Sequence, residues 1–87
     1  MSTSKTLTVR YFASIREAVG TGQETLQTQA DTLGALRDEL IARGGPWAAS
    51  LARGRAVRMA LDQVMAGDDA PLAPGAEAAF FPPVTGG

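Results

Sequence analysis

The side chains that usually carry out covalent chemistry are absent from this sequence. It contains no Cys and no His, which excludes a Ser–His or Cys–His nucleophile and any metal site built from Cys or His ligands. A metal site made only of carboxylates needs clustered acids, and the acidic pair Asp68–Asp69 stands in a segment typical of a turn. We therefore expect no metal site, and no conventional acid, base or nucleophile from a side chain.

The main-chain carboxylate of Gly87, at the end of the sequence, is the reactive group that remains. It follows a run of prolines and small residues: Pro82, Pro83, Val84, Thr85 and Gly86. Proline lacks a backbone N–H and holds the chain extended, whereas glycine has no Cβ and passes through narrow openings. Six residues span at most about 20 Å. The pattern predicts a thin, stiff tail that inserts into a pocket of another protein.

A carboxylate is a poor electrophile, so a reaction at Gly87 needs prior activation. Adenylation with ATP by a separate activating enzyme would give an acyl-adenylate, and the chain itself is expected to bind no cofactor. Attack by a sulfide equivalent would then give a thiocarboxylate, whereas attack by an amine would give an amide. The residues alone leave three alternatives open: a sulfur carrier, a protein modifier, and an interaction domain whose tail is inert.

Segments in which apolar and polar residues alternate predict the strands that must position this tail. They cover residues 5–12, 23–29 and 56–63, a short piece at 64–65, and residues 76–81. In the first strand, the side chains on the Leu7 face should point to the core, which leaves Phe12 on the opposite face. In the last strand, Phe80 should point to the core and Phe81 should point away from it.

Two helices are predicted from the spacing of apolar residues and from their end signals. The first covers residues 13–19, with Ser14 as a possible cap and Gly20 as its stop. The second is the main helix, and its cap is Asp31 or Thr32, between which the sequence does not decide.

The main helix carries an apolar stripe that should pack on the sheet, made of Leu33, Leu36, Leu40 and Ile41. Arg37 is expected on the opposite, polar side, and Gly34 is expected to allow close packing on the sheet. The helix should end at residues 44–46, Gly-Gly-Pro. We interpret Trp47, which follows, as a core plug rather than a stacking platform, because no basic groove accompanies it.

The order of these elements predicts one α+β domain. A strand hairpin, a helix and further strands within 87 residues fit a β-grasp fold, a mixed sheet with one main helix packed on one face. In that arrangement the first and last strands are parallel neighbours at the centre of the sheet. We assign residues 1–81 to the β-grasp domain and residues 82–87 to its extended tail.

Two phenylalanines are expected on the sheet face opposite the main helix. If the first and last strands are neighbours, Phe12 and Phe81 lie close together, and Met65 is an apolar residue that can join them. An apolar cluster on a solvated face suggests a binding site for another protein. The alternative is local burial of one ring against the short helix, but two rings beside an unusual tail favour the partner surface.

The overall composition narrows the partners and the compartment. The net charge of −1 gives no electrostatic case for binding nucleic acid or an anionic membrane. The first residues do not form a signal peptide, and no apolar run approaches the length that spans a membrane. Together with the absence of Cys, these features favour a cytoplasmic protein.

Much of the sequence resembles the small subunits of molybdopterin synthase, a family of sulfur carriers. The matching stretches are Val-Arg-Tyr-Phe-Ala-Ser-Ile-Arg-Glu at 9–17, Arg-Met-Ala-Leu-Asp-Gln at 58–63, Pro-Leu at 71–72, Pro-Gly-Ala-Glu at 74–77, and Phe-Phe-Pro-Pro-Val-Thr-Gly-Gly at 80–87. The last stretch is the most specific. The chain departs from the family at Ala76, where an acid is usual, and at Asp62, where Asn is frequent; neither position takes part in the chemistry of the tail.

The resemblance implies a ubiquitin-like β-grasp sulfur carrier, the non-catalytic sulfur-donor subunit of a heterotetrameric synthase. An E1-like activating enzyme would use ATP to adenylate Gly87, which would then become a thiocarboxylate. The tail would enter the large catalytic subunit and donate sulfur to cyclic pyranopterin monophosphate in molybdenum cofactor biosynthesis. The apolar partner contacts of the family correspond to Phe12, Met65 and Phe81. The alternatives are a sulfur carrier for thiamine or cysteine synthesis and a ubiquitin-like protein modifier.

Overall fold

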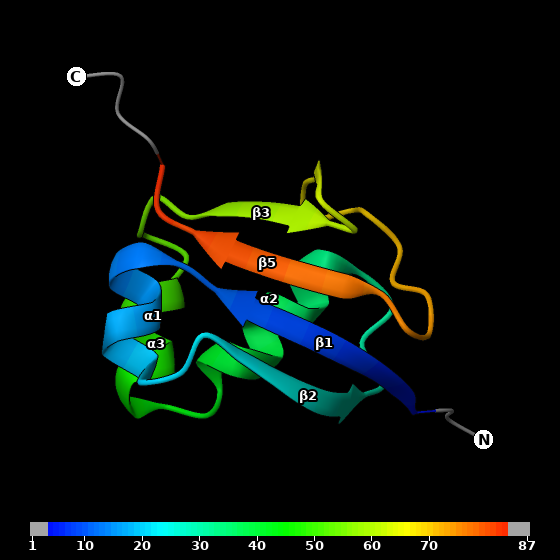
Figure 1. Ribbon diagram of the computed structural model, residues 1–87, viewed down its shortest axis with the longest axis horizontal. Helices are drawn as coiled ribbons and strands as arrows, with labels where there is room; N and C mark the ends of the chain where they lie inside the picture. Colours follow the sequence, from blue (N-terminus) through cyan, green and yellow to red (C-terminus); the bar gives the residue numbers. More distant parts are fainter. Residues whose placement is uncertain (1–3, 84–87) are drawn as a thin grey trace.

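The computed structural model describes residues 4–83, which form a five-stranded sheet with helices packed against it (Figure 1). The elements in chain order are β1 (Lys5–Tyr11), α1 (Ala13–Val19), β2 (Gln23–Thr28), α2 (Leu33–Ile41), α3 (Gly45–Leu51), β3 (Arg58–Leu61), β4 (Val64–Met65) and β5 (Glu77–Phe81). The strands lie side by side in the order β2-β1-β5-β3-β4.

The first and last strands are parallel neighbours at the centre of the sheet. β1 pairs antiparallel with β2 and parallel with β5, and β5 pairs antiparallel with β3. In the parallel register, Tyr11 lies opposite Phe80. The predicted α+β architecture, a mixed β-grasp sheet with the main helix on one face, is therefore confirmed.

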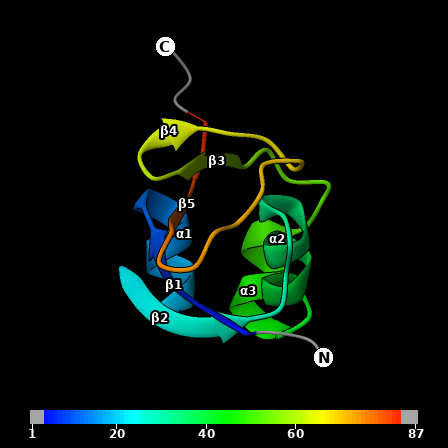
Figure 2. The ribbon, with the colours of Figure 1, turned by 90° about the vertical axis from the view of Figure 1, so that its right-hand side faces the viewer.

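The core lies between the sheet and α2, which packs with α3 on one side of the sheet (Figure 2). Its largest fully buried side chains are Tyr11, Phe80, Leu7, Leu33, Leu36, Leu40, Leu51 and Val9. Each buried leucine or phenylalanine contributes about 1.5–3 kcal/mol relative to an exposed one. The predicted inward face of β1 and the predicted leucine stripe of α2 are both correct.

No helix within residues 4–83 combines the length and the apolar character that crossing a membrane requires.

The two helix starts differ in how they are capped. Thr32 caps α2, because its hydroxyl accepts a hydrogen bond from the Ala35 N–H at 3.1 Å. Helix α1 covers Ala13–Val19 as predicted, but the prediction of Ser14 as its cap is wrong, because Phe12 takes the cap position without a side-chain hydrogen bond. Gly20 ends α1 as predicted, with a φ of 85°.

Arg37 is buried rather than on a polar face of α2, so that prediction is also wrong. Its Nε donates to the carbonyl of Leu51 at 2.7 Å, and its Nη2 donates to the carbonyl of Ala52 at 2.8 Å. These carbonyls belong to the last residue of α3 and to its cap residue, where no helical N–H is available to them. The guanidinium therefore joins the end of α3 to α2.

Gly34 allows close packing, but against the segment after β4 and not against the sheet. A Cβ at this position would lie 2.8 Å from the Cβ of Asp68. The Gly34 N–H donates to the carbonyl of Asp68 at 2.9 Å, and Arg53 donates to the carbonyl of Gly34 at 2.9 Å. Arg53 also donates hydrogen bonds to the carboxylates of Asp38 and Asp68. These hydrogen bonds hold the loop of Asp68 against the start of α2.

The third strand is shorter than predicted, because it covers only Arg58–Leu61. Asp62 and Gln63, which the alternation assigned to the strand, have φ values of 51° and 69° and form the tight turn into β4. Positive φ at both central residues is typical of a two-residue hairpin turn.

Trp47 is partly buried against the core, which confirms its interpretation as a plug. Its Nε1 donates to the hydroxyl of Tyr11 at 3.1 Å, and that hydroxyl donates to Glu24 at 2.7 Å. The indole therefore connects α3 to the end of β1.

Candidate functional site

The end of β5 is the most firmly held point near the tail. Phe80 has no exposed surface, and its ring stacks on that of Tyr11 with centroids 6.4 Å apart. Its backbone lies between Tyr11 of β1 and Met59 of β3. The sheet thus fixes the chain on both sides up to Phe81, and Pro82 follows directly, where no N–H remains to continue the ladder.

Phe12 and Phe81 meet on the face of the sheet opposite α2, as predicted. Their ring centroids are 6.3 Å apart and the rings stand edge to face at 88°, an arrangement that aromatic pairs favour. Phe12 is 37% exposed, and Phe81 is half-buried. Together with Ala13, Pro82 and Pro83, they line an apolar hollow of about 400 Å³.

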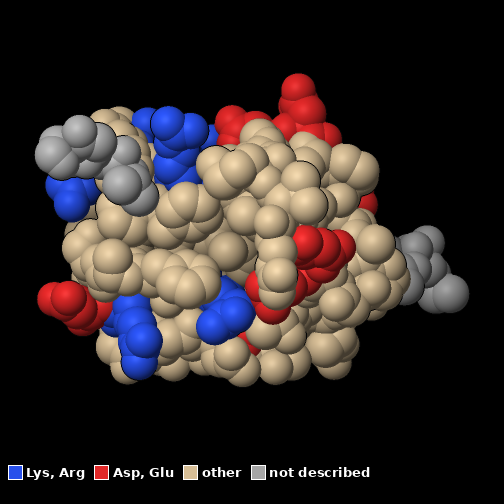
Figure 3. Space-filling model, turned by 45° about the horizontal axis from the view of Figure 1, so that its top comes forward, with Lys and Arg blue, Asp and Glu red and all other residues tan. Residues whose placement is uncertain are grey.

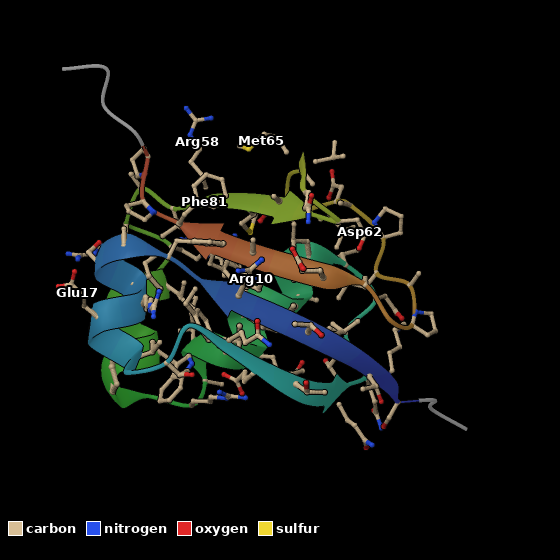
Figure 4. All side chains as sticks on the ribbon, viewed as in Figure 1. Arg10, Glu17, Arg58, Asp62, Met65 and Phe81 are labelled. Carbon is tan, nitrogen blue, oxygen red and sulfur yellow. The ribbon has the colours of Figure 1, made fainter. Side chains whose placement is uncertain are left out.

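Met65 lies on the same face but not beside the two rings. It is 55% exposed and lies opposite Ala60, which in turn lies opposite Ala79 of β5. Met65 lines a separate hollow with Arg58 and Met59. Figure 4 shows Met65 beyond β3, whereas Phe81 is on β5. The structure therefore brings two of the three predicted contact residues together and leaves the third two strands away.

Ala60 and Ala79 form a low floor between the rings and Met65, and sequence reasoning gave them no role. They are 7% and 6% exposed although they belong to the outer face. Small side chains in the middle of a sheet face leave room for larger groups from another molecule. The sequence feature that could have predicted this floor is a pair of alanines at outward positions of two strands that become neighbours.

Arg10 is a second residue that sequence reasoning missed. The alternation of the first strand places it on the same outward face as Phe12. Its guanidinium carbon lies 5.2 Å from the centre of the Phe12 ring, within the range of a cation–π interaction. Its Nε is buried and has no hydrogen-bond partner among residues 4–83. The cue in the sequence was an arginine two residues before an outward phenylalanine on the same strand face.

A polar network on the core side holds the end of β1 in place. The two Nη groups of Arg43 donate to the two carboxylate oxygens of Glu24 at 2.9 and 3.0 Å, and Tyr11 donates to the same carboxylate. Burial alone would raise the pKa of Glu24, but the hydrogen bonds from Arg43 and Tyr11 outweigh it and lower that pKa. Burial, reinforced by the bond to Glu24, raises the pKa of Tyr11. Both groups keep their ordinary charge at neutral pH.

The reactive end of the predicted tail lies outside the described residues. Val84, Thr85, Gly86 and Gly87 belong to that part of the chain. Pro82 and Pro83 are described and are half-buried beside the two rings. The roles assigned to Gly87 and to the tail stay predictions.

The sequence matches known proteins along nearly its whole length. The model of the ThiS family matches residues 9–87. The molybdopterin synthase sulfur carrier subunit of Escherichia coli is 42% identical over 79 residues, which are 91% of this chain and 96% of that protein. The protein of the same name from Haemophilus influenzae is 37% identical over 81 residues, which are 93% and 99% of the two chains.

Solved structures share the fold. SAMP1 from Haloferax volcanii is 26% identical with a TM-score of 0.76, over 94% of this chain and 99% of that chain. A chain from the complex of subunits 1 and 2 of molybdopterin-converting factor from Helicobacter pylori is 28% identical with a TM-score of 0.62, again over 94% and 99%. The chain therefore belongs to the ThiS family, and the curated relatives it resembles along almost their full length are molybdopterin synthase sulfur carrier subunits.

Proposed function

We propose that this chain is the sulfur carrier subunit of a molybdopterin synthase and that it carries sulfur on the carboxyl group of Gly87. The observation that carries the proposal is the anchored exit of the chain from the sheet. Phe80 is buried in the core and Phe81 contacts Phe12 on the outer face, so the chain is held in place up to the prolines that precede the predicted tail. The names of the curated relatives support the same reading.

The proposed chemistry takes place in two steps at the carboxyl carbon of Gly87. A carboxylate oxygen attacks the α-phosphorus of ATP on an E1-like activating enzyme, and pyrophosphate leaves. A sulfide equivalent then attacks the carboxyl carbon of the acyl-adenylate, the C–O bond to AMP breaks, and a thiocarboxylate remains. ATP is a substrate of the activating enzyme, and this chain needs no bound cofactor for either step.

The proposed acceptor is cyclic pyranopterin monophosphate, held by a large catalytic subunit. A solved relative is a complex of subunits 1 and 2 of molybdopterin-converting factor, which supports a partner of this kind. We propose that the partner docks on the outer face, over Phe12, Phe81 and the alanine floor, with Met65 at the far edge of the contact. In that pose the tail enters the partner beside the place where it leaves the sheet.

The intact mass of the chain tests the proposed carrier. Incubation with the activating enzyme, ATP and a sulfur source should replace one oxygen by one sulfur, and the unmodified mass also verifies that the chain ends at Gly87. A chain that lacks Gly87 is the matched control. No mass change of the wild type in a system that modifies a known carrier would contradict the proposal. Formation of molybdopterin with the large subunit and pyranopterin then identifies the pathway.

A protein modifier is the second candidate. The similarity to SAMP1, whose name stands for small archaeal modifier protein 1, supports this alternative. The same adenylate would then react with a lysine amine of another protein, and the product would be an amide with higher mass than either chain. Transfer of sulfur without such conjugates supports the carrier, and conjugates without transfer support the modifier. Sulfur transfer only to a thiamine or cysteine precursor would instead assign the chain to one of those pathways.

A further inference from the structure

Four arginines surround the place where the chain leaves the sheet, and we call them the arginine rim: Arg10, Arg16, Arg55 and Arg58. Arg10 lies over the ring of Phe12, and Arg58 lies opposite Phe81 in the register of β3 and β5. Figure 4 shows Arg10 on β1 and Arg58 on β3, on either side of β5. These two residues therefore flank the pair of aromatic rings.

The other two members of the rim are placed by the hollows that they line. Arg16, from α1, lines a hollow together with Arg10 and Phe12. Arg55, from the segment before β3, lines a hollow together with Pro82. Arg16 therefore lies near Phe12, and Arg55 lies near the start of the tail.

Within residues 4–83, the rim arginines differ from the other basic residues because their side chains have neither a carboxylate partner nor a carbonyl partner. Lys5, Arg43 and Arg53 each have a carboxylate within 3.4 Å, and Arg37 is bound by carbonyls. Within residues 4–83, no carboxylate lies at ion-pair distance from any rim arginine. The positive charge around the rings is therefore not neutralised by the described part of the chain.

The acidic side chains of the same face gather at the other end of the sheet. Asp62 accepts a hydrogen bond from the Glu77 N–H at the turn end of β3, and both lie away from the rings (Figure 4 labels Asp62). Figure 3 shows most blue side chains on the left half of the view, which is the side where β5 ends in Figure 1. Most red side chains lie on the right half. Glu17 of α1 is the exposed acid on the basic half. The face is therefore polarised along its length.

Among the rim arginines, Arg10 is the one whose contact with a partner should cost the least free energy of dehydration and ordering. Its Nε is already buried without an acceptor, so its dehydration is not a further cost of complex formation. The guanidinium carbon lies 5.2 Å from the centre of the Phe12 ring, and this contact restricts the side chain before binding, which reduces the entropy lost on binding. A planar, oriented guanidinium matches a carboxylate, which it can bind with two parallel hydrogen bonds.

We propose that the partner that docks on the outer face presents a carboxylate side chain to Arg10, within an acidic patch that matches the arginine rim. The inference rests on the proposed function, which makes the large synthase subunit that partner. Three features carry it: the unpaired arginines, the position of the Arg10 guanidinium over the ring of Phe12, and the apolar rings between Arg10 and Arg58. The carboxylate of the partner accepts hydrogen bonds from the two Nη groups of Arg10, because the buried Nε offers no surface to another molecule, and the charge of the rim orients the approach.

The affinity of the full-length chain for the large subunit, measured at low and at high NaCl, tests this inference. Arg10→Met keeps the aliphatic volume and removes the charge, so the dissociation constant should rise about 30-fold at low salt. Because the lost interaction is electrostatic, the variant should also depend less on salt than the wild type. Arg10→Lys keeps the charge and loses the bidentate geometry, and its affinity should fall between the two.

Lys5→Met is the matched control, since it removes one positive charge at the far end of β1. Its affinity should equal that of the wild type. Thermal unfolding of Arg10→Met should occur at or above the temperature of the wild type, because the variant removes an unsatisfied buried donor. If that variant does not fold, Arg10→Lys carries the same comparison.

Each remaining outcome decides a different claim. Equal affinity of Arg10→Met and wild type, or a loss that is the same at all salt concentrations, overturns the carboxylate contact and leaves the proposed function intact. No binding of the wild-type chain overturns both. Arg10→Glu should abolish the complex, and replacing one acidic residue of the partner by Arg should restore it. A scan of the exposed acids of the partner in which none restores it also overturns the contact.

Discussion

Phe80 and Phe81 are adjacent in the chain and have opposite environments. Phe80 is fully buried, whereas Phe81 is half-buried and contacts Phe12. The alternation of a strand predicts this difference from the sequence, because successive side chains point to opposite faces. One residue therefore secures the end of β5, and the next is available to a partner.

Substitution of each phenylalanine should separate folding from docking. Phe81→Asp places a charge on the docking face and should raise the dissociation constant for the large subunit about 30-fold or more, with little change in the unfolding temperature. Phe80→Ala leaves a cavity and should lower the free energy of unfolding by about 3–5 kcal/mol. Calorimetric titration and thermal unfolding measure the two effects. Unfolding of the Phe81→Asp variant would instead assign Phe81 to the core.

Gly34→Ala should destabilise the domain although alanine favours helices. The new Cβ would lie 2.8 Å from the Cβ of Asp68, so α2 or the loop of Asp68 must shift, at a cost of about 1–3 kcal/mol. Gly67→Ala is the matched control, because no atom lies within 4 Å of a Cβ at that position. Chemical denaturation of both variants decides the matter, and equal stability would show that the loop adjusts without strain.

Arg37 shows why some residues could not be placed from the sequence. Helical spacing assigned it to a polar side of α2, since arginine is rarely buried without a partner. Its partners are carbonyls at the end of α3, and carbonyl acceptors leave no trace in the residue types. Arg10 was missed for a related reason, because its surroundings depend on the neighbouring strand and on the turn of the chain at Phe12.

At the level of elements, the two helix caps make a direct comparison. Thr32→Ala removes the hydroxyl that accepts the Ala35 N–H and should lower the free energy of unfolding by about 1 kcal/mol. Ser14→Ala should have almost no effect, because Ser14 is exposed and Phe12 occupies the cap position of α1. Denaturant titrations of both variants provide the measurement. A larger loss for Ser14→Ala than for Thr32→Ala would reverse the assignment.

The elements themselves were predictable, and their ends less so. The period-two and helical patterns located the strands within residues 4–83 and both predicted helices, whereas α3, which contains Trp47, was not among the predicted helices. The third strand was extended too far because Asp62 and Gln63 continue its alternation, although their positive φ values place them in a turn. A glycine or asparagine at this position would have predicted the turn from the sequence, whereas Gln63 is not typical of a turn.

At the level of the whole molecule, the network of Glu24 joins β2 to β1 and to the helices. The pKa of Glu24 is lowered in the folded chain because hydrogen bonds from Arg43 and Tyr11 outweigh its burial. A carboxyl of this kind stabilises the fold above its unfolded pKa, and the contribution disappears as pH falls through the folded pKa. Acid should therefore weaken this connection before it weakens the apolar core.

Glu24→Gln should lower the free energy of unfolding by about 2 kcal/mol at neutral pH. The difference from the wild type should shrink as pH falls below about 4, because both side chains are then uncharged. Asp31→Asn is the control, since its carboxylate is 93% exposed and 3.4 Å from Lys5, and such pairs contribute little. Unfolding curves over a pH series test the prediction, and a difference that does not depend on pH would contradict it.

Docking and chemistry should be separable across the molecule, because the described domain supplies the surface and Gly87 supplies the reacting carbon. A chain without Gly87 keeps Phe12, Phe81 and the arginine rim, so it should fold like the wild type and bind the large subunit. It lacks the carboxyl group in its proper position and should transfer no sulfur. Added to a working synthase, it should therefore inhibit by competing with the thiocarboxylated chain. Inhibition that excess wild-type carrier does not relieve would mean that the shortened chain acts elsewhere, and sulfur transfer by the shortened chain would remove Gly87 from its proposed role.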